Sequence, residues 1–575
     1  MSLIKANAVQ IGQSGTATQN FTLAVPSSPD GTIKLARGNA GATTQDVISV
    51  DASGNINGLV KSTGSTTARS LANRFADVVN VKDFGAVGDG VADDTAAISL
   101  ALAAGQQIVF PHGDYLITTN ITVGAGKALV FNTGASVTST TTNTLNLNNN
   151  AELVADRSRI FNGSASCTNI KTAYPEWWGA IHSTTVESNS AFQSALDALK
   201  ESGTLLLNNG YYALNGVTAL SITKGQCVIG QGKNNTSFRI TTPQTNVFRI
   251  TNTLGVCLKG FRIQNTIPAT SGIAIYFEQT IGNTLGRFSL DDIYMESVYE
   301  GIYFQGNSTQ TLNTGSISNV YLRSVYSYGI KYDWCENIFN YNVQINADTG
   351  TGSGAPNSGI ILFNKCQTVD FTDCGVGNCS GSALFIQNSL GVISRGQDVR
   401  WCKFIGCLFD DSGNGANIFV ASNLQFTNCW FSSNGRTFRG YAGNGIWIRQ
   451  NTESISIIGG IISNNGQRGV RVESGAIGVQ IRDVQLSGNS VNDITATAFW
   501  AIDLYGGTSN FSIIGCDIKN NGYGWDDGNS KGIQVRSGSS NNYIITNNLI
   551  NVPIPNNISD NGSGTNKYVA NNITY

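Results

Sequence analysis

Residues 402–409 read CKFIGCLF, and residues 424–431 read LQFTNCWF. Both follow one template, in which apolar residues fill positions one, three, six and eight and position five is glycine, asparagine or aspartate. Eleven copies of the template stand at 256–263, 288–295, 315–322, 338–345, 369–376, 402–409, 424–431, 455–462, 479–486, 511–518 and 543–550. Their spacing lies within the period of about 20–50 residues that is typical of stacked repeats.

Alternating apolar and polar residues indicate a strand with one buried face. The fifth position interrupts this alternation as a corner would. In most copies a second strand follows, opened by a glycine at Gly272, Gly301, Gly329, Gly359, Gly445, Gly469 or Gly532. One copy cannot bury its inner face alone, so the copies must stack as coils. We therefore predict a parallel β-helix. A β-sandwich, the alternative, gives no reason for side-chain type to persist column by column.

The composition limits the class of protein. The chain has 575 residues, 66 of them glycine and nine proline, 13% charged residues and a net charge of −2. This argues against a helical or disordered chain. Near-neutral charge argues against a nucleic-acid partner. No apolar run approaches about 18 residues, so no membrane span is expected, and the first residues show no signal peptide.

Eleven cysteines are scattered without CxxC pairs, and there are only two histidines. Neither a disulfide framework nor a metal site is indicated, and we expect no cofactor. The cysteines read as small core residues of a chain folded in a reducing cytosol. Four of them, Cys374, Cys407, Cys429 and Cys516, hold position six of the template and should share one interior row.

A second duplication lies upstream. Residues 84–98 and 108–115 contain a pattern that returns, more loosely, at 178–196 and 205–212. Each copy predicts a short amphipathic helix, with Asp94 or Asn189 as its polar N-cap, followed by a strand. Such a helix would cover the otherwise exposed end of the coils.

The segment at residues 83–95, DFGAVGDGVADDT, resembles the opening motif of the pectate-lyase-like superfamily as found in bacteriophage tailspikes. The resemblance covers roughly residues 80–575. It implies an all-β, right-handed, single-stranded parallel β-helix and a homotrimer. Asp89, Asp93 and Asp94 could serve as catalytic groups or calcium ligands, but we expect them to close the turn and cap the helix.

Residues 1–80 are similar to the short N-terminal segments that anchor phage tail proteins to another virion component. The domain boundaries expected are 1–80 for this anchor and its linker, 81–250 for the opening coils, 251–550 for the β-helix with the glycan site, and 551–575 for a short end. The resemblance implies a virion tailspike that acts outside the cell on the capsular polysaccharide of encapsulated bacteria such as Klebsiella. Tyr303, Trp447 and Trp500 are apolar outward residues that a trimer would cover.

Hydrolysis of a glycosidic bond needs two carboxyl groups, about 5–5.5 Å apart for retention and about 6.5–9.5 Å for inversion. The interior columns are apolar, so these groups must project outward. The catalytic candidates are Glu300, Asp333, Glu336, Asp370 and Asp373, and the substrate-binding candidates are Arg323, Tyr332, Trp334, Arg400 and Trp401.

Three alternatives stay open at this point. A polysaccharide lyase needs a charge neutraliser and a base, for which Arg323, Tyr326, Lys331 and Tyr341 are available. A non-catalytic adhesin would bind the capsule only. A secreted glycosidase fits the anchor-like N-terminus poorly, and the Gly-His-Gly and Arg-Ile-Lys motifs of polygalacturonases are absent from the sequence.

Overall fold

The computed structural model describes residues 8–16, 19–25, 31–39, 42–148, 150–215, 217–242, 246–280, 285–347, 357–393, 397–435, 443–491, 499–521, 530–552 and 556–574. The chain divides into two compact units, Met1–Ile170 and Lys171–Tyr575. Strands dominate both units, which confirms the all-β class. None of the described helices is long and apolar enough to cross a membrane.

The first unit opens with an antiparallel sheet in which each strand pairs with the next along the chain. Its strands are β1 (Ala8–Ile11), β2 (Phe21–Ala24), β3 (Ile33–Asn39), β4 (Ala42–Val50), β5 (Ile56–Val60) and β6 (Arg69–Ser70). The short helix α1 (Leu71–Phe75) follows. The antiparallel pairing sets this segment apart from all later coils.

Parallel coils begin with β7 (Val78–Asn80). They build three short sheets in the first unit. These sheets contain β7, β9 (Gln107–Phe110), β12 (Ala128–Phe131) and β15 (Glu152–Val154); β8 (Asp89–Asp93), β10 (Gly113–Leu116), β13 (Ala135–Ser139) and β16 (Phe161–Gly163); and β11 (Ile121–Val123), β14 (Thr144–Leu147) and β17 (Ser166–Thr168).

The two copies of the upstream sequence pattern fold into the same order of elements. In each unit a 3-10 helix, η2 (Val81–Phe84) or η3 (Pro175–Trp178), ends at a left-handed glycine. A strand and a ten-residue helix follow, β8 and α2 (Thr95–Ala104) or β19 (Ser183–Glu187) and α3 (Asn189–Ala198). The N-cap of α3 is Ser188, so the prediction of Asn189 is wrong by one residue; the Asn189 side chain instead accepts a bond from the backbone of Asn215.

The aspartates of the opening motif hold local structure. The Asp94 carboxylate accepts bonds from the backbone N–H groups of Val87 and Gly88, at 2.7 and 3.2 Å. Asp89 accepts from two backbone N–H groups of its own turn, and Asp93 accepts from both donors of Thr95. These hydrogen bonds lower the pKa of both Asp89 and Asp93. Their role in closing the turn agrees with the expectation. Asp94 holds the N-cap position of α2, but its side chain makes no cap hydrogen bond to the helix.

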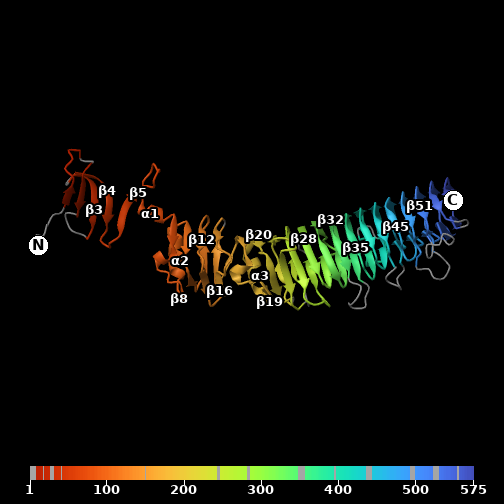
Figure 1. Cartoon of the computed structure of the whole chain (residues 1–575), viewed down its shortest axis with the longest axis horizontal. Coiled ribbons are helices and arrows are strands. Elements are labelled where there is room, and N and C mark those ends of the chain that lie inside the picture. The colour runs from red at the N-terminus through yellow and green to blue at the C-terminus, as the bar shows by residue number, and fades with distance from the viewer. Residues whose placement is uncertain are drawn as a thin grey trace. The chain divides into compact units, whose positions relative to one another are not determined.

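The second unit stacks three long parallel sheets (Figure 1). The first sheet contains β22 (Leu220–Ile222), β25 (Phe248–Thr251), β27 (Ile273–Glu278), β29 (Glu300–Gln305), the first parts of β32 (Tyr328–Tyr341) and β34 (Ser358–Thr372), β36 (Ser382–Gln387), β40 (Asn414–Ile418), β43 (Ile446–Ile448), β46 (Val470–Val472), β49 (Ile502–Leu504), β52 (Ile533–Gly538) and β55 (Ile558–Gly562).

The second sheet contains β20 (Leu199–Leu206), β23 (Cys227–Ile229), the first parts of β26 (Cys257–Asn265) and β28 (Gly286–Glu296), β30 (Leu312–Ser318), the second parts of β32 and β34, β38 (Lys403–Ile405), β41 (Ala421–Thr427), β44 (Glu453–Ile458), β47 (Gln480–Arg482), β50 (Ser512–Ile514), β53 (Tyr543–Thr546) and β56 (Lys567–Ala570). The third sheet contains β21 (Gly210–Leu214), β24 (Thr236–Ile240), the second parts of β26 and β28, β31 (Tyr321–Val325), β33 (Gln344–Ala347), β35 (Gly375–Gly377), β39 (Leu408–Asp410), β42 (Trp430–Ser432), β45 (Ile461–Ser463), β48 (Gln485–Ser487), β51 (Asp517–Lys519), β54 (Leu549–Asn551) and β57 (Ile573–Thr574).

The template positions stack as the sequence predicts. Position three of each copy pairs in register with position three of the next, from Leu258 to Ile545. The four cysteines of position six are buried in one interior row, and all eleven cysteines are free thiols. Position five, the corner between the second and third sheets, has a positive φ in every copy: Gly260, Asp292, Asn319, Asn342, Asp373, Gly406, Asn428, Gly459, Asp483, Gly515 and Asn547.

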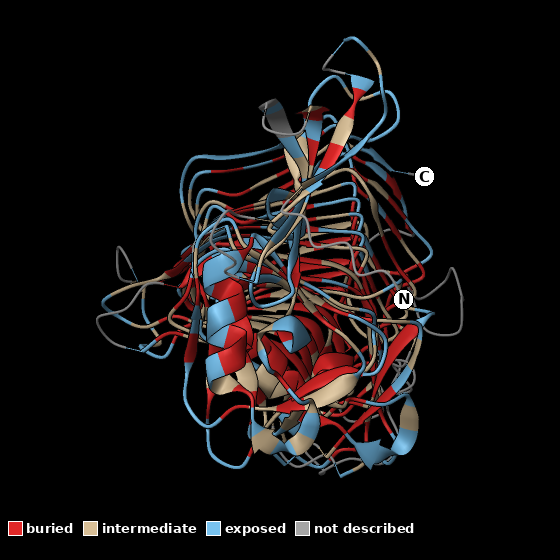
Figure 2. Ribbon diagram, turned by 90° about the vertical axis from the view of Figure 1, so that its left-hand side faces the viewer, coloured by how far each residue is buried: buried red, intermediate tan, exposed pale blue. Residues whose placement is uncertain are grey.

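The interior between the sheets is apolar, with buried residues on the inner faces of the coils (Figure 2). Phenylalanine rings stack from coil to coil, as at Phe371, Phe404 and Phe426, with centroids 5.1 and 4.7 Å apart. A ladder of buried asparagines follows the third sheet. In each step one asparagine donates its amide to the side-chain oxygen of the next, through Asn434, Asn465, Asn489 and Asn521.

The three outward apolar residues expected at a trimer interface are covered by cations of their own chain. The amine of Lys331 lies 4.4 Å from the Tyr303 ring centroid, and Trp447 and Trp500 also carry cations over their rings. A different apolar surface is more exposed, at the corner between the second and third sheets. This apolar corner patch contains Phe339, Tyr341, Ile405, Leu408 and Trp430.

Replacing Asn465 by alanine should destabilise the fold. Its oxygen accepts two bonds from Asn434, and its amide donates to Phe431 O and Asn489 Oδ1. Unsatisfied buried groups cost about 1–3 kcal/mol each, so we expect Asn465→Ala to lower the free energy of unfolding by about 3 kcal/mol. Denaturant unfolding measures this. The exposed Asn551→Ala is the control, and equal losses in both variants would contradict the role of the ladder.

Candidate functional site on the first sheet

The outward side chains of the first sheet form two columns that run from coil to coil. The register places Arg249, Tyr276, Tyr303 and Lys331 on consecutive rungs of one column. The neighbouring column carries Glu278, Gln305 and Asp333 on three consecutive rungs. Aromatic, cationic and carboxyl groups therefore meet on one outer face.

Asp333 lies at the centre of this surface. Asn364 Nδ2 donates to its Oδ1 at 2.7 Å, and the Tyr303 hydroxyl donates to its Oδ2 at 3.2 Å. The residue is only 8% exposed. Burial raises its pKa above the ordinary value, against the opposing effect of the bond from Asn364. A carboxyl with a raised pKa keeps its proton to a higher pH than an ordinary aspartate does, which is the property that a general acid uses.

Glu278 is the carboxyl that the sequence reasoning missed. It is two rungs from Asp333 in the same column, which corresponds to about 10 Å at about 4.8 Å per rung. This is close to the upper end of the about 6.5–9.5 Å expected for inversion. Arg249 Nε donates to Glu278 Oε2 at 2.7 Å. Aligning the glycine-opened strands as a second template could have found it.

Glu300 lies on the same face and is the first residue of β29. The last residue of β29, Gln305, is the one that pairs in register with Asp333. Glu300 Oε2 accepts the Tyr328 hydroxyl at 2.6 Å, and burial raises the pKa of Glu300. Because a strand rises about 3.3 Å with each residue, Glu300 is too far along the strands to act with Asp333 on one glycosidic bond. Its bond instead fixes Tyr328 at the edge of the cluster.

We call Tyr276, Glu278, Glu300, Tyr303, Tyr328, Lys331 and Asp333 the Asp333 cluster. Lys331 joins the part around Asp333 to the part around Glu300. Its amine lies 4.4 Å from the Tyr303 ring centroid and 6.0 Å from that of Tyr328. Its charge lowers the pKa of Asp333 and of Glu300, but by less than burial raises each. Burial also raises the pKa of Tyr276 to about 12 and raises the pKa of Tyr303 and Tyr328. These hydroxyls therefore stay protonated and can donate hydrogen bonds.

The other predicted carboxyls do not join this cluster. Glu336 follows the left-handed corner at Trp334 and pairs with Lys365 at 2.5 Å. Asp370 faces outward on the second sheet, where burial raises its pKa and its Oδ1 accepts the backbone N–H of Lys403. Asp373 is an exposed position-five corner with φ 53°.

The predicted sugar-binding residues are also dispersed. The prediction of Tyr332 is wrong, because its side chain is fully buried and its hydroxyl donates to Asn340 Oδ1 inside the coils. Trp334 and Trp401 occupy left-handed corners, and Trp401 is about half exposed. Arg400 pairs with buried Asp398 at 2.6 Å. Arg323 belongs to the third sheet, 3.9 Å from Glu296.

A groove of about 320 Å³ lies on the third sheet. Gly375 and Gly377 of β35 lack side chains there, and Tyr321, Asp410 and Asp411 stand around it. Ser432 Oγ donates to Asp410 Oδ1 at 2.7 Å. Within the described ranges, no three His, Cys, Asp or Glu side chains gather as metal ligands would.

Residues 78–379, more than half of the chain, match the family described as rhamnogalacturonase A/epimerase, pectate lyase-like. The chain belongs to this family. Residues 358–573 also match the right-handed β-helix region, which gives the coils their hand. The expectation of a pectate-lyase-like fold is confirmed, and family membership supports a polysaccharide-acting protein.

Curated relatives match only short segments. The mannuronan C5-epimerases AlgE5 and AlgE2 of Azotobacter vinelandii are 52% identical over 44 residues. The non-secreted LysM effector LysM19 of Penicillium expansum is 45% identical over 56 residues. Each match covers 7% of this chain, which spans only 4% of the length of each relative.

Solved structures with a similar fold include the A-module of Azotobacter vinelandii mannuronan C-5 epimerase AlgE6. The match has 15% sequence identity and a TM-score of 0.47, and it covers 70% of this chain and 99% of that one. The bacteriophage phi29 gene product 12 has 13% identity and a TM-score of 0.49, over 70% and 56%. Tailspike protein 2 of bacteriophage CBA120 has 14% identity and a TM-score of 0.37, over 68% and 52%.

Asp333→Asn should stabilise the protein more at pH 7 than at pH 4. The raised pKa of Asp333 means that its protonated form stabilises the fold at low pH, and this contribution is lost as the pH rises through the folded-state pKa. The neutral amide avoids that loss. Thermal unfolding across this pH range tests the difference, with Asp373→Asn as control. A gain independent of pH would contradict a buried, proton-holding Asp333.

Proposed function

We propose that this protein is a polysaccharide depolymerase that hydrolyses glycosidic bonds on the outer face of the first sheet. The observation that carries the proposal is the placement of Asp333. Its pKa is raised, it lies two rungs from Glu278, and the tyrosines Tyr276 and Tyr303 occupy the neighbouring column. Family membership over residues 78–379 supports a polysaccharide as substrate.

In this proposal Asp333 donates its proton to the leaving glycosidic oxygen. Glu278, paired with Arg249, accepts a proton from the attacking water on the opposite side of the sugar. Gln305 lies between them in register, and the Tyr276 hydroxyl donates to its side-chain oxygen. The rings of Tyr276 and Tyr303, stacked with centroids 5.4 Å apart, support the sugar. The backbone separation of about 10 Å is nearer to the carboxyl spacing of inverting enzymes than to that of retaining ones.

A polysaccharide lyase is the second candidate, and Lys331 favours it. Its amine lies on the same face and could neutralise a uronate carboxylate. Elimination by a tyrosinate base is opposed by the raised pKa of Tyr303 and Tyr328. A third candidate, an adhesin that binds the capsule without cleaving it, needs the same exposed groups.

We further propose that the protein is a phage tailspike on the virion tail, a homotrimer, and directed at capsular polysaccharide. Three features support this: the resemblance of residues 83–95 to the tailspike opening motif, the separate antiparallel sheet of β1 to β6, which would dock on another tail component, and the apolar corner patch. Large exposed apolar patches mark interfaces. The patch, rather than Trp447 or Trp500, is the proposed subunit contact.

Asp333→Asn and Glu278→Gln should each reduce kcat about 100-fold or more, because each removes a proton-transfer group. Reducing-end release from a panel of purified capsular polysaccharides, Klebsiella types included, measures this. The matched controls Asp373→Asn and Glu336→Gln should keep full activity. Unchanged activity in Asp333→Asn would overturn the assignment.

The same reactions separate the mechanisms. Hydrolysis releases reducing ends without absorbance from an unsaturated uronate, and NMR of the first product should show an inverted anomer. New absorbance would support the lyase. Binding without release from every capsule tested would support the adhesin.

Sedimentation should give about three times the chain mass of 60.9 kDa. Trp430→Glu places a charge in the apolar corner patch and should shift the protein toward monomer, while Asn551→Ala should not. A monomer in the unsubstituted protein would overturn the trimer.

A further inference from the structure

Beyond the Asp333 cluster, the first sheet carries an alternating stack of cations and rings. We call Phe419, Arg449, Trp447, Arg471, Tyr505 and Arg536 the arginine–aromatic stack. The Arg449 guanidinium lies 4.8 Å from the Phe419 centroid and 5.0 Å from that of Trp447, Arg471 lies 4.5 Å from Trp447 and 5.2 Å from Tyr505, and Arg536 lies 4.2 Å from Tyr505.

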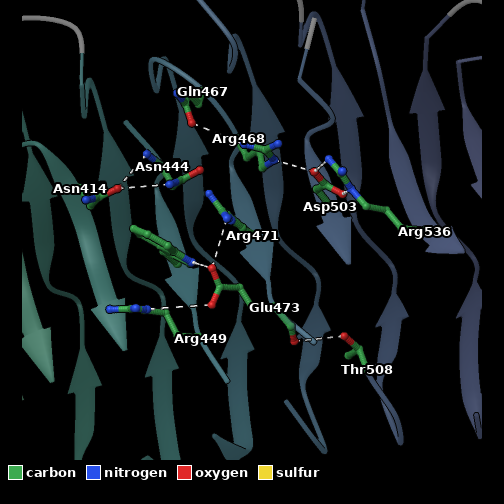
Figure 3. Close-up of polar contacts among 11 residues, drawn as sticks. Asn414, Asn444, Arg449, Gln467, Arg468, Arg471, Glu473, Asp503, Thr508 and Arg536 are labelled. Atoms are coloured by element: carbon green, nitrogen blue, oxygen red, sulfur yellow. Dashed lines mark hydrogen bonds and ion pairs between the residues drawn. The ribbon is translucent and has the colours of Figure 1, made fainter. Parts of the chain in front are cut away.

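Two carboxylates accept hydrogen bonds from the guanidinium groups of this surface (Figure 3). Glu473 accepts bonds from Trp447 Nε1 at 2.9 Å and Arg471 Nη2 at 3.1 Å, and its other oxygen lies 3.9 Å from Arg449 Nε. Asp503 accepts from both Arg468 and Arg536. Among the described residues shown there, four arginines therefore face two carboxylates, which leaves two positive charges in excess.

The guanidiniums also have spare donors. Arg449 Nε and Arg471 Nε are buried and form no hydrogen bond within the described ranges, so an incoming group can reach only the terminal guanidinium nitrogens. Arg471 Nη2 already donates to Glu473, and the Arg449 side chain is about a third exposed. A guanidinium offers five N–H donors in a fixed plane. Rings on either side hold the planes of Arg449 and Arg471 in place, so their remaining donors are pre-organised for an incoming carboxylate.

A purely structural role explains this surface poorly. The Arg468–Asp503 pair is buried and can serve the fold, but Arg449 and Arg536 are each about a third exposed. Exposed ion pairs contribute little to stability, and an excess of like charge opposes folding. The chain has only 13% charged residues and a net charge of −2, so a local excess of cations is a departure from its average. An anion bound at the surface would remove the repulsion.

The stack lies on the same face as the proposed cleavage site. Lys331 and Arg471 are five rungs apart in one column, through Ile361, Phe385, Asn417 and Trp447. At about 4.8 Å per rung, this separation exceeds the length of a single sugar several-fold. Aromatic and apolar groups occupy much of the intervening path. A linear polymer could therefore reach both places at once, whereas a small anion would contact one of them.

We propose that the arginine–aromatic stack is a second glycan site, which binds carboxylate groups of an acidic polysaccharide and holds the polymer on the protein while the Asp333 cluster acts on it. This deepens the proposed function, because both sites take the same polymer. Arginine supplies bidentate bonds to each carboxylate, and the exposed edges of the rings contact the sugars.

Binding is best measured in the Asp333→Asn protein, which should leave the polymer intact. The probes are alginate, polygalacturonate and an acidic capsular polysaccharide, each beside its carboxyl-reduced form, with neutral dextran as blank. We expect at least one acidic polymer to bind in a salt-dependent way. Adding Arg471→Gln should weaken its affinity about tenfold, and Arg449→Gln with Arg471→Gln about 100-fold, since each removes charge-assisted bonds.

The matched control is Arg482→Gln, which removes an exposed cation from the second sheet. It should leave affinity unchanged. Arg471→Lys keeps the charge but loses the planar fork, and should bind with an affinity between those of the unsubstituted arginine and Arg471→Gln. Carboxyl reduction of the polymer should weaken binding as much as the double substitution does. Thermal unfolding checks that each variant is folded.

Three outcomes would overturn the proposal: no acidic polymer binds, carboxyl reduction has no effect, or Arg471→Gln and Arg482→Gln bind alike. If Arg471→Gln alone dissociates an oligomer and leaves glycan affinity unchanged, the stack is a contact between copies instead. Carboxylate-dependent binding without cleavage of any polymer would contradict the depolymerase and leave this second site standing.

Discussion

The left-handed corner between the second and third sheets is the constraint on which the second unit depends. At every template copy one residue adopts a positive φ, which turns the chain while leaving position six inside. An ordinary L-residue in this conformation costs roughly 1–2 kcal/mol, and glycine, asparagine and aspartate tolerate it best. The abundance of glycine and asparagine is therefore a consequence of the coil geometry. With the corner fixed, cysteine, phenylalanine and isoleucine rows align and fill the interior.

This constraint explains why the fold could be predicted from the sequence. The template marks both the buried columns and the corner, and each can be checked against ten other copies. The row from Leu258 to Ile545 and the cysteine row could be predicted without knowing how the loops are folded. The opening aspartates were also predictable, because short polar residues beside glycines usually close turns. The N-cap of α3 differed by one residue because Asn189 is used to bind the backbone of Asn215 instead.

The site was harder to predict, because outward positions carry no periodic signal. The corner at Trp334 shifts the alternation, so that Tyr332 and Cys335 point inward and Asp333 points outward. In an uninterrupted strand Cys335 would share the outward face with Asp333, and Glu336 would point inward with Tyr332. Glu278 comes from a strand two coils earlier, and only the register of the first sheet joins it to Asp333. Asp373 could have been excluded from sequence, since it occupies position five of its own copy.

Unequal spacing between the template copies has its own consequence. Most contacts of a coil are with the coil on either side, although Lys233 Nζ reaches further to donate to the backbone oxygen of Asn319. The cost of closing a longer loop rises slowly with its length. Segments can therefore lengthen or shorten between corners while the ladder beneath them keeps its register. The scaffold thus separates the ladder, which must keep its register, from the segments between corners, whose length can vary.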